Sequence, residues 1–327
     1  MKPQERSSLA GLAPYVPGKA KAAGFDNPLK LSANENPLGC SPAARAAYLA
    51  ASGEIHLYPD AQTSRLRAAV AERFELEPER LVFGAGSDEI FAMAAQAYLA
   101  DGCNIVQPRY AFAAWAIAAR AAGGEVKSAP ENDFAVDVDA MMAAVDEQTR
   151  LVFIANPANP TGTWIPFSEV ERLHTGLPEH VLLVLDGAYA ECAGSVEGFS
   201  DGLAWARDKQ NVLVTRTFSK VYGLASLRIG WGYAPPAVAE VLNRIRLPFS
   251  VPRAGEAAAV AALADEAFTR RSVQRVEEGR AALAEALRGF GLRTLPTATP
   301  RSIPIFSVSR RSRHPNGRFW PQRWRRG

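Results

Sequence analysis

The sequence predicts an α/β fold in which a mainly parallel sheet lies between helices. Three observations support this. Short apolar runs alternate with helical patterns between residues 64 and 233. The helical segments are long enough to cross over between parallel strands. Finally, 48% of the 327 residues are hydrophobic, which is sufficient for a large buried core.

The elements can be assigned in chain order. Residues 1–30 are rich in Pro, Gly and Lys and are expected to form an extended arm. A loop over 34–39 leads to an alanine-rich helix over 42–51. In the alternating region we expect strands over 81–84, 104–107, 125–128, 151–155, 181–185, 211–215 and 228–233. The helices between them are expected over 64–74, 88–99, 111–122, 138–145 and 169–173, the last starting at a capping box of Ser168 and Glu171.

After Ala234 the pattern becomes helical, over 236–246 and 252–290. From this change we predict four segments. Residues 1–50 form the arm and part of a small domain, and residues 51–240 form a large domain that contains the sheet. Residues 241–299 form the helical part of the small domain, and residues 300–327 are an arginine-rich tail.

The charge of the chain is unevenly distributed. Eight arginines and no acidic residues occur over 300–327, so this tail has a charge of +8, the first 299 residues have −5, and the sum is +3. Apolar runs are too short to span a membrane, and the first residues show no secretory signal, so we expect a cytoplasmic protein. Three widely spaced cysteines support neither a disulfide framework nor a zinc site.

Lys220 is a candidate reactive amine. The chain has only 7 lysines against 30 arginines, and Lys220 follows an apolar strand closely. A lysine that is removed from water has a lowered pKa and can form a Schiff base. Nearby Thr217, Ser219 and Arg228 offer hydrogen-bond donors for a phosphate.

The segment Gly84–Glu89 ends a predicted strand and begins a helix. Glycines allow a tight turn, and the amides at a helix N-terminus bind anions such as phosphate. A dinucleotide fingerprint would need a third glycine where Glu89 stands. An ordinary turn with Ser87 as N-cap remains an alternative.

Two further strand ends have polar side chains. The apolar run Val181–Leu185 is followed by Asp186, and a buried carboxylate needs a partner. A magnesium-binding strand of the Walker type would need a Gly-Lys-Ser/Thr loop, which the sequence lacks. A helix-capping role for Asp186 remains an alternative. The loop Asn156–Gly162 contains two Asn-Pro steps, which direct an amide across the same sheet edge.

An amine, a phosphate site, a carboxylate and an amide are thus expected at one edge of the sheet. Together they suit an aromatic cofactor with a carbonyl, a phosphate and a basic ring nitrogen. Pyridoxal 5'-phosphate has all three groups.

Several segments, in order and spacing, resemble the histidinol-phosphate aminotransferases, which are class II aminotransferases of fold type I. They are KLSANENPLG, YPD, GAGSDE, NPANPTGT, LDGAY and TRTFSKVYGLASLRIGW, and the resemblance covers about residues 10–298. It implies a large domain with a mainly parallel sheet between helices and a smaller α/β domain, which is incomplete in this chain.

The resemblance also implies roles for individual residues. Lys220 would form the Schiff base, Asp186 would pair with the ring nitrogen, and Tyr189 would bind the phenolic oxygen. The remaining cofactor contacts would be Asn159 at the phenolic oxygen, Tyr110 on the ring, Ser87, Asp88, Thr217, Ser219 and Arg228 at the phosphate, and Tyr58 from the second subunit of a homodimer. Tyr15 and Asn34 would contact the substrate. No metal is implied.

The implied reaction is transamination between histidinol phosphate, or a related aromatic amino acid, and 2-oxoglutarate in histidine biosynthesis. Two alternatives from other classes remain. One is a pseudoenzyme that binds pyridoxal phosphate without turnover, and the other is a related decarboxylase of a phosphorylated amino acid. Neither a nucleic acid nor a membrane is an expected partner.

The tail departs from the family pattern. In that family the chain continues into a small-domain sheet, which contains an arginine that binds the α-carboxylate of the substrate. Here residues 300–327 are rich in Arg, Pro and Trp and lack periodicity, so we expect a truncated or frameshifted C-terminus. A segment that binds nucleic acid or a membrane, and a divergent arm on a working enzyme, remain alternatives.

Overall fold

The structure is a computed structural model that describes residues 3–15, 33–292 and 294. The predictions for the tail over 300–327, and for the arm over 1–2 and 16–30, lie outside these residues. No helix in the described part of the chain is both long and apolar enough to cross a membrane.

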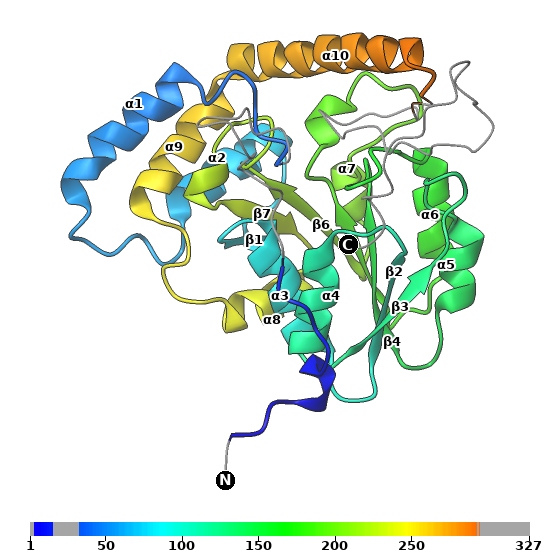
Figure 1. Ribbon diagram of the computed structural model, residues 1–327. Helices are drawn as coiled ribbons and strands as arrows, with labels where there is room; N and C mark the ends of the chain where they lie inside the picture. Colours follow the sequence, from blue (N-terminus) through cyan, green and yellow to red (C-terminus); the bar gives the residue numbers. More distant parts are fainter. Residues whose placement is uncertain (1–2, 16–32, 293, 295–327) are drawn as a thin grey trace.

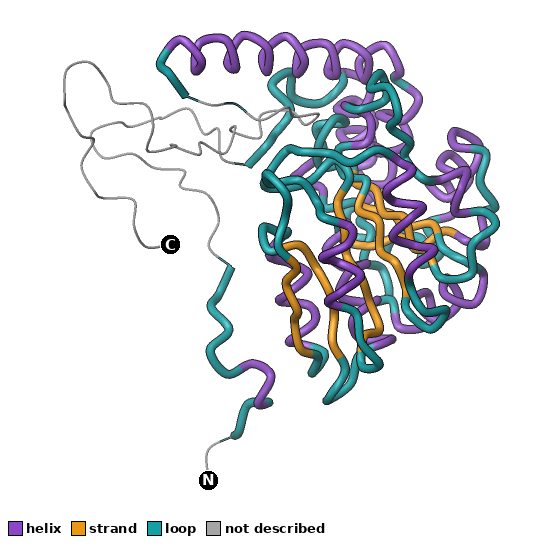
Figure 2. The backbone as a smooth tube through the Cα atoms, turned by 90° about the vertical axis from the view of Figure 1, so that its right-hand side faces the viewer, coloured by secondary structure: helices purple, strands orange, loops and turns teal. Residues whose placement is uncertain are grey.

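A seven-stranded sheet forms the centre of the molecule. Its strand order is β1-β7-β6-β5-β4-β2-β3. The strands are β1 (Leu81–Gly84), β2 (Asn104–Pro108), β3 (Glu125–Ala129), β4 (Thr149–Ala155), β5 (Leu182–Asp186), β6 (Val212–Thr217) and β7 (Gly230–Tyr233). All neighbouring pairs from β6 to β3 are parallel. The predicted mainly parallel sheet is therefore confirmed, and Figure 2 shows its strands between layers of helices.

β7 is the exception, since it is antiparallel to both β6 and β1. The chain returns from β6 to β7 without a crossover helix of the length that parallel pairing needs. β7 was predicted to begin at Arg228 but begins at Gly230, because Arg228 has a left-handed backbone with φ 51°.

Ten α-helices surround the sheet in the described residues. They are α1 (Pro42–Ala51), α2 (Ser64–Phe74), α3 (Ser87–Tyr98), α4 (Ala113–Ala121), α5 (Val138–Ala144), α6 (Phe167–Gly176), α7 (Leu203–Ala206), α8 (Pro236–Ile245), α9 (Arg253–Ala264) and α10 (Glu266–Gly289). The short helix α7 was not predicted.

Two predicted helix boundaries are wrong. Ser168 does not cap α6, because the helix already begins at Phe167 with Pro166 as N-cap. The predicted helix over 252–290 is two helices that meet at Asp265. Its carboxylate accepts a hydrogen bond from the Phe268 amide at 3.0 Å and so begins α10.

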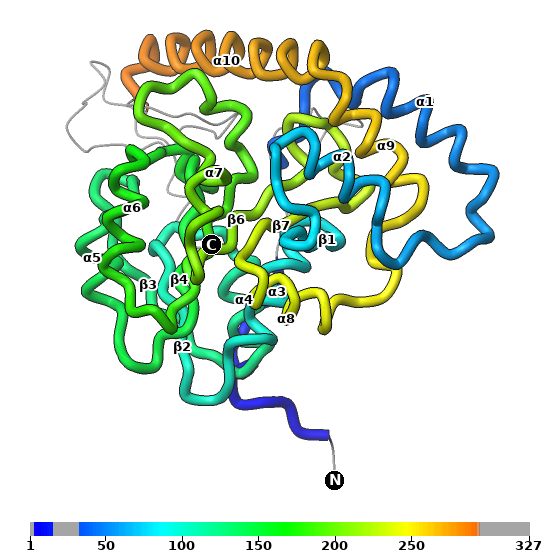
Figure 3. The backbone as a smooth tube through the Cα atoms, turned by 180° about the vertical axis from the view of Figure 1, so that it is seen from behind, coloured from blue at the N-terminus to red at the C-terminus, as the bar shows by residue number. Residues whose placement is uncertain are grey.

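Alternating strand residues form two apolar layers, as expected for strands buried on both faces. One layer joins the sheet to α3, α4 and α8 and contains Phe91, Trp115 and Phe153. The other lies on the opposite face with α2, α5 and α6. Figure 1 shows the first helical layer in front, and Figure 3 shows the molecule from behind.

Beyond the sheet, α1 and α2 pack against α9, and α10 contacts the 3-10 helix η4 (Ala190–Cys192). In Figures 1 and 3, α10 runs along the top of the molecule. These contacts connect the start and the end of the described chain to the sheet.

Candidate active site

The candidate site lies at one edge of the sheet. The carboxyl ends of β1 to β6 all point to this edge, and β7 begins there because it is antiparallel. This places Gly84, Ala155, Asp186 and Thr217, with the loops that follow them, along one line of strand ends. Ligands bind at this edge in open α/β sheets.

Lys220 lies in the turn after β6. Its Nζ donates a hydrogen bond to the Ala33 carbonyl at 3.4 Å and lies 5.6 Å from the centre of the Tyr189 ring. Burial lowers the pKa of the Lys220 ammonium, while Asp186 and Asp88 act in the opposite direction. The neutral, nucleophilic amine is therefore more populated than in an exposed lysine.

Asp186 ends β5 and is 5% exposed. Its Oδ1 accepts hydrogen bonds from the Ala188 amide at 3.0 Å and from Thr215 Oγ1 at 3.3 Å. Burial raises the pKa of Asp186 to about 7, although these bonds and Lys220 favour the charged form. Both bonds end on Oδ1, so a cationic N–H donor at Oδ2 would stabilise the carboxylate further.

Asn34 meets Tyr189 at this edge. The Asn34 side-chain amide donates to the Tyr189 phenol oxygen at 2.9 Å. Burial raises the pKa of the Tyr189 phenol, although the Asn34 bond acts in the opposite direction. Two of the predicted site residues are thus in direct contact, whereas Tyr15 is exposed.

The segment that contains Asn34 is joined to the lysine turn. The Asn36 side-chain amide donates to the Val221 carbonyl at 2.6 Å and to Ser272 Oγ of α10 at 2.9 Å. Gly223 lies so close to Gly39 that a Cβ added to Gly223 would be 2.0 Å from the Gly39 carbonyl oxygen. The segment over 36–39 thus packs closely on the residues that follow Lys220.

Arg228 is at the centre of a second group of polar side chains. Its Nη1 donates to Ser219 Oγ at 3.2 Å, and its Nη2 donates to Asp88 Oδ2 at 2.9 Å. The Ser219 amide in turn donates to Thr217 Oγ1 at 3.1 Å. An added Cβ on Gly86 would be 2.4 Å from Arg228 Nη2, so a glycine is needed for this approach.

The N-terminus of α3 completes the group. Gly86, with φ 81°, is the N-cap, and Ser87 is the first helical residue, so the alternative in which Ser87 is the N-cap is wrong. Gly230 of β7 allows close packing, because an added Cβ would be 2.2 Å from the Ser87 amide nitrogen. Free helix amides, hydroxyls and a guanidinium fit a phosphate.

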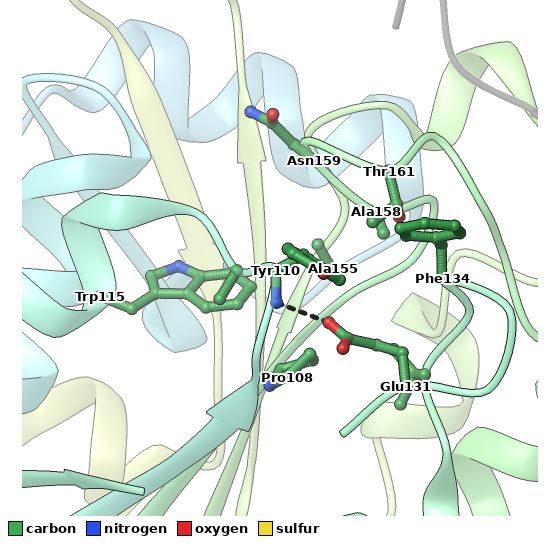
Figure 4. A pocket seen from close by; sticks show the side chains of 11 residues that line it. Pro108, Tyr110, Trp115, Glu131, Phe134, Ala155, Ala158, Asn159 and Thr161 are labelled. Atoms are coloured by element: carbon green, nitrogen blue, oxygen red, sulfur yellow. Dashed lines mark hydrogen bonds between the residues drawn. The ribbon is translucent and has the colours of Figure 1, made fainter. Parts of the chain in front are cut away.

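Tyr110 and Asn159 line one small pocket (Figure 4). The Tyr110 amide donates to Glu131 Oε1 at 2.6 Å, and its ring lies 5.5 Å from that of Phe134. Asn159 belongs to the loop after β4. In this loop Asn156 exchanges hydrogen bonds of 3.0 and 3.1 Å with the Ile165 backbone.

Glu131 and Phe134 also line this pocket and were not predicted from the sequence. Glu131 follows the carboxyl end of β3, and this position at a strand end is a signal that could have identified it. The sequence gives no comparable signal for Phe134. It lies shortly before the hydrophobic segment that begins α5, so its own apolar side chain suggests a core residue.

Tyr58 is a predicted site residue that lies at the surface. It is 78% exposed, and its ring stacks on Phe249 with centroids 4.7 Å apart. The described residues of this single chain show no hydrogen bond or ring contact between Tyr58 and the group around Lys220.

Comparison with known proteins decides the family. The family model for aminotransferase class I and II matches residues 26–315. The chain belongs to the class I and II aminotransferase family. This confirms the enzyme class that the sequence motifs indicate.

Two curated relatives of this aminotransferase are histidinol-phosphate aminotransferases. The one from Caulobacter vibrioides is 55% identical over 295 residues, which are 90% of this chain and 82% of the relative. The one from Sphingopyxis alaskensis is 49% identical over 304 residues, or 91% of this chain and 82% of the relative. The predicted resemblance is therefore confirmed.

Solved structures confirm the fold. Histidinol-phosphate aminotransferase from Sinorhizobium meliloti, in complex with pyridoxal-5'-phosphate, matches with a TM-score of 0.78 and 33% identity over 82% of this chain and 72% of that one. Aspartate aminotransferase from Thermus thermophilus has the same fold, with a TM-score of 0.74 and 23% identity over 83% of this chain and 75% of that one. The predicted fold type I architecture is thus present in this aminotransferase.

Proposed function

We propose that this aminotransferase uses pyridoxal 5'-phosphate to transfer the amino group of histidinol phosphate, or a related aromatic amino acid, to 2-oxoglutarate in histidine biosynthesis. The observation that carries the proposal is the placement of Lys220 and Asp186. They lie at one sheet edge. Burial raises the pKa of Asp186 and lowers that of Lys220, so it favours the neutral form of both groups. The names of the relatives support the substrate.

The residues of the site fit this cofactor. Asp186 would hold the ring nitrogen, Tyr189 and Asn159 the phenolic oxygen, and Tyr110 the face of the ring. The phosphate would lie at the start of α3, bound by the backbone and hydroxyl groups of Ser87, Asp88, Thr217 and Ser219 and by Arg228. The raised pKa of Asp186 agrees with this assignment, since a buried carboxylate requires a positive partner to remain charged.

When bound, the cofactor supplies a carbonyl that condenses with amines and a ring that accepts the electrons released when the substrate loses its α-proton. The Lys220 amine would be the nucleophile that binds the cofactor carbonyl. In its neutral form it would also be the base that takes the α-proton of the substrate and the acid that returns it. Asp186 keeps the ring nitrogen protonated, and Asn34 orients the Tyr189 phenol. Tyr15 and Asn34 would contact the substrate.

We also propose that two copies of the chain form a homodimer in the cytoplasm. Several large apolar side chains are exposed in the single chain around α1, residues 55–58 and the segment after α8, namely Tyr48, Leu49, Ile55, Leu57, Tyr58, Leu247 and Phe249. Arg253, the first residue of α9, holds the segment with residues 55–58, because it donates to the Tyr58 carbonyl at 2.9 Å and pairs with Glu54. Exposed apolar patches of this kind favour association. Tyr58 would then reach the site of the second subunit.

The test is a spectroscopic titration of the full chain, first with pyridoxal phosphate and then with histidinol phosphate. We expect the absorbance band of the lysine-bound cofactor to appear and then to change to that of the amine form. A band without this change would indicate binding without turnover, and release of carbon dioxide would indicate a decarboxylase. Sedimentation of the same sample measures the mass of the assembly.

A further inference from the structure

Two phenylalanines, Phe134 and Phe249, have backbone conformations that bulky residues rarely adopt. Their φ angles are 66° and 61°, in the left-handed region that favours glycine. Such a conformation persists only where the surrounding structure holds it, and it is concentrated at functional sites. Both residues therefore need an explanation beyond core packing.

Each of these rings contacts a tyrosine that we assign to the cofactor. Phe134 lies against Tyr110 with ring centroids 5.5 Å apart and an angle of 34° between the planes. Phe249 stacks on Tyr58 at 4.7 Å and 27°. The same rare backbone conformation thus occurs twice, each time beside a predicted cofactor contact.

The backbone of each tyrosine is also held by a charged side chain. Glu131 Oε1 accepts the Tyr110 amide at 2.6 Å (Figure 4). Arg253 Nη2 donates to the Tyr58 carbonyl at 2.9 Å. Each tyrosine therefore has one contact that fixes its ring and one that fixes its main chain.

The conformation of Phe134 is held by buried hydroxyls. Thr163 Oγ1 donates to the Phe134 carbonyl at 2.8 Å, and this hydroxyl is also 2.8 Å from Thr161 Oγ1. Both threonines are at most 5% exposed and lie in the loop that contains Asn159. The next residues, Ala135 and Val136, pack against the core, whereas Phe134 lines the pocket with Tyr110.

We propose that Phe134 and Phe249 are positioning residues, each of which fixes the ring of its tyrosine for contact with the cofactor. Tyr110 is 44% exposed and Tyr58 is 78% exposed, so without a neighbouring ring either side chain could rotate in solvent. Holding the ring in place before binding reduces the entropy lost on binding. The inference rests on the proposed function, because only there do these tyrosines contact the cofactor.

A double-mutant cycle on the full chain tests the first pair. The dissociation constant of pyridoxal phosphate is measured by absorbance for wild type, Phe134→Ala, Tyr110→Ala and the double variant. We expect Phe134→Ala to weaken binding about tenfold in the wild-type background and less than about twofold when Tyr110 is already alanine. An equal loss in both backgrounds would overturn the proposal. Phe249→Ala and Tyr58→Ala form the equivalent cycle.

Stability measurements separate positioning from structural damage. Glycine adopts a positive φ without strain, so Phe134→Gly should melt at a higher temperature than Phe134→Ala while its cofactor affinity is equally weak. Wild-type affinity in Phe134→Gly would contradict the proposal. Glu131→Gln keeps an acceptor for the Tyr110 amide and should bind the cofactor more tightly than Glu131→Ala.

The outcome for wild type separates this inference from the proposed function. If the wild-type chain shows no absorbance band of the lysine-bound cofactor, both fail. If the band appears in wild type, is lost in Lys220→Ala and changes to that of the amine form when histidinol phosphate is added, the proposed function stands. An additive Phe134 cycle would then refute the positioning role alone.

Discussion

The side-chain amide of Asn34 donates a hydrogen bond of 2.9 Å to the phenol oxygen of Tyr189, across 155 residues of sequence. It joins the loop before α1 to the turn after β5, so the phenol already has a fixed orientation. Tyr189→Phe removes the acceptor and leaves the amide unpaired, and we expect about 0.5–1.5 kcal/mol of lost stability. Urea denaturation measures this loss, and Tyr48→Phe, on the surface, should show almost none.

Lys220→Ala should abolish the band of the lysine-bound cofactor and lower turnover by at least about 100-fold, because nucleophile and general base are lost together. Lys127→Ala is the matched control, since Lys127 lies on β3 and pairs with Asp146. A stopped-flow absorbance assay follows both variants. An unchanged spectrum in Lys220→Ala would refute the assignment.

Asp186→Asn tests the cost of a buried carboxylate in cofactor-free protein. The pKa of Asp186 is raised from its usual 3.8 to about 7 in the folded chain, so between these values the folded state binds more protons than the unfolded state. The stability of wild type therefore falls as the pH rises through this window and is constant above it. The amide that replaces the carboxyl group in the variant does not titrate, so it adds no such dependence.

Urea denaturation of wild type and Asp186→Asn at pH 4, 6 and 8 measures the effect. The variant should gain stability relative to wild type as the pH rises from 4 to about 7. A difference that does not change with pH would contradict the raised pKa. With cofactor bound, wild type should be the more stable of the two proteins, because the carboxylate of Asp186 then has a positive partner.

Arg216 is a buried cation with two acidic partners. It is 4% exposed and pairs with Glu191 at 3.0 Å and with Asp201 at 3.3 Å. Arg216→Ala leaves the partly buried Glu191 without compensation, and we expect a loss of about 3–5 kcal/mol. Chemical denaturation checks this value. Arg172→Ala, which breaks ion pairs on the surface, should cost far less, because solvent screens exposed ion pairs.

Gly230→Ala should separate β7 from the start of α3. Its Cβ would lie 2.2 Å from the Ser87 amide nitrogen, so backbone must move, and we expect a loss of at least about 1–3 kcal/mol and weaker cofactor binding. Gly279→Ala in α10 meets nothing within 4 Å and should stabilise the protein by about 0.5–1 kcal/mol. Equal effects of the two changes would contradict the packing argument.

Much of the fold could be predicted, because buried strands read as apolar runs that end in polar residues. The same pattern located Asp186 and the loop that contains Lys220. The antiparallel direction of β7 could not be read in this way, since direction depends on the path between strands rather than on their composition. The break at Asp265 is a single capping residue within an otherwise continuous helical pattern.

The finer geometry of the site was less accessible from sequence. Phe134 and Arg228 have positive φ angles, which are imposed by tertiary contacts and which their residue types do not indicate. Tyr58 was expected to contact a second subunit, and its 78% exposure in the single chain is compatible with that expectation. The predicted domain boundaries near residues 50 and 240 remain predictions.

The pairing of β1 with β7 affects how the protein is made. β1 ends at Gly84, and within the sheet it pairs only with β7, which begins at Gly230. A ribosome that adds about 5–20 residues per second needs roughly 7–30 s to make the chain between them. During that time β1 is unpaired, and the turn at Gly86, where we propose that the phosphate binds, lacks its neighbour. A nascent chain stalled before residue 230 should therefore not yet bind the cofactor phosphate at this turn.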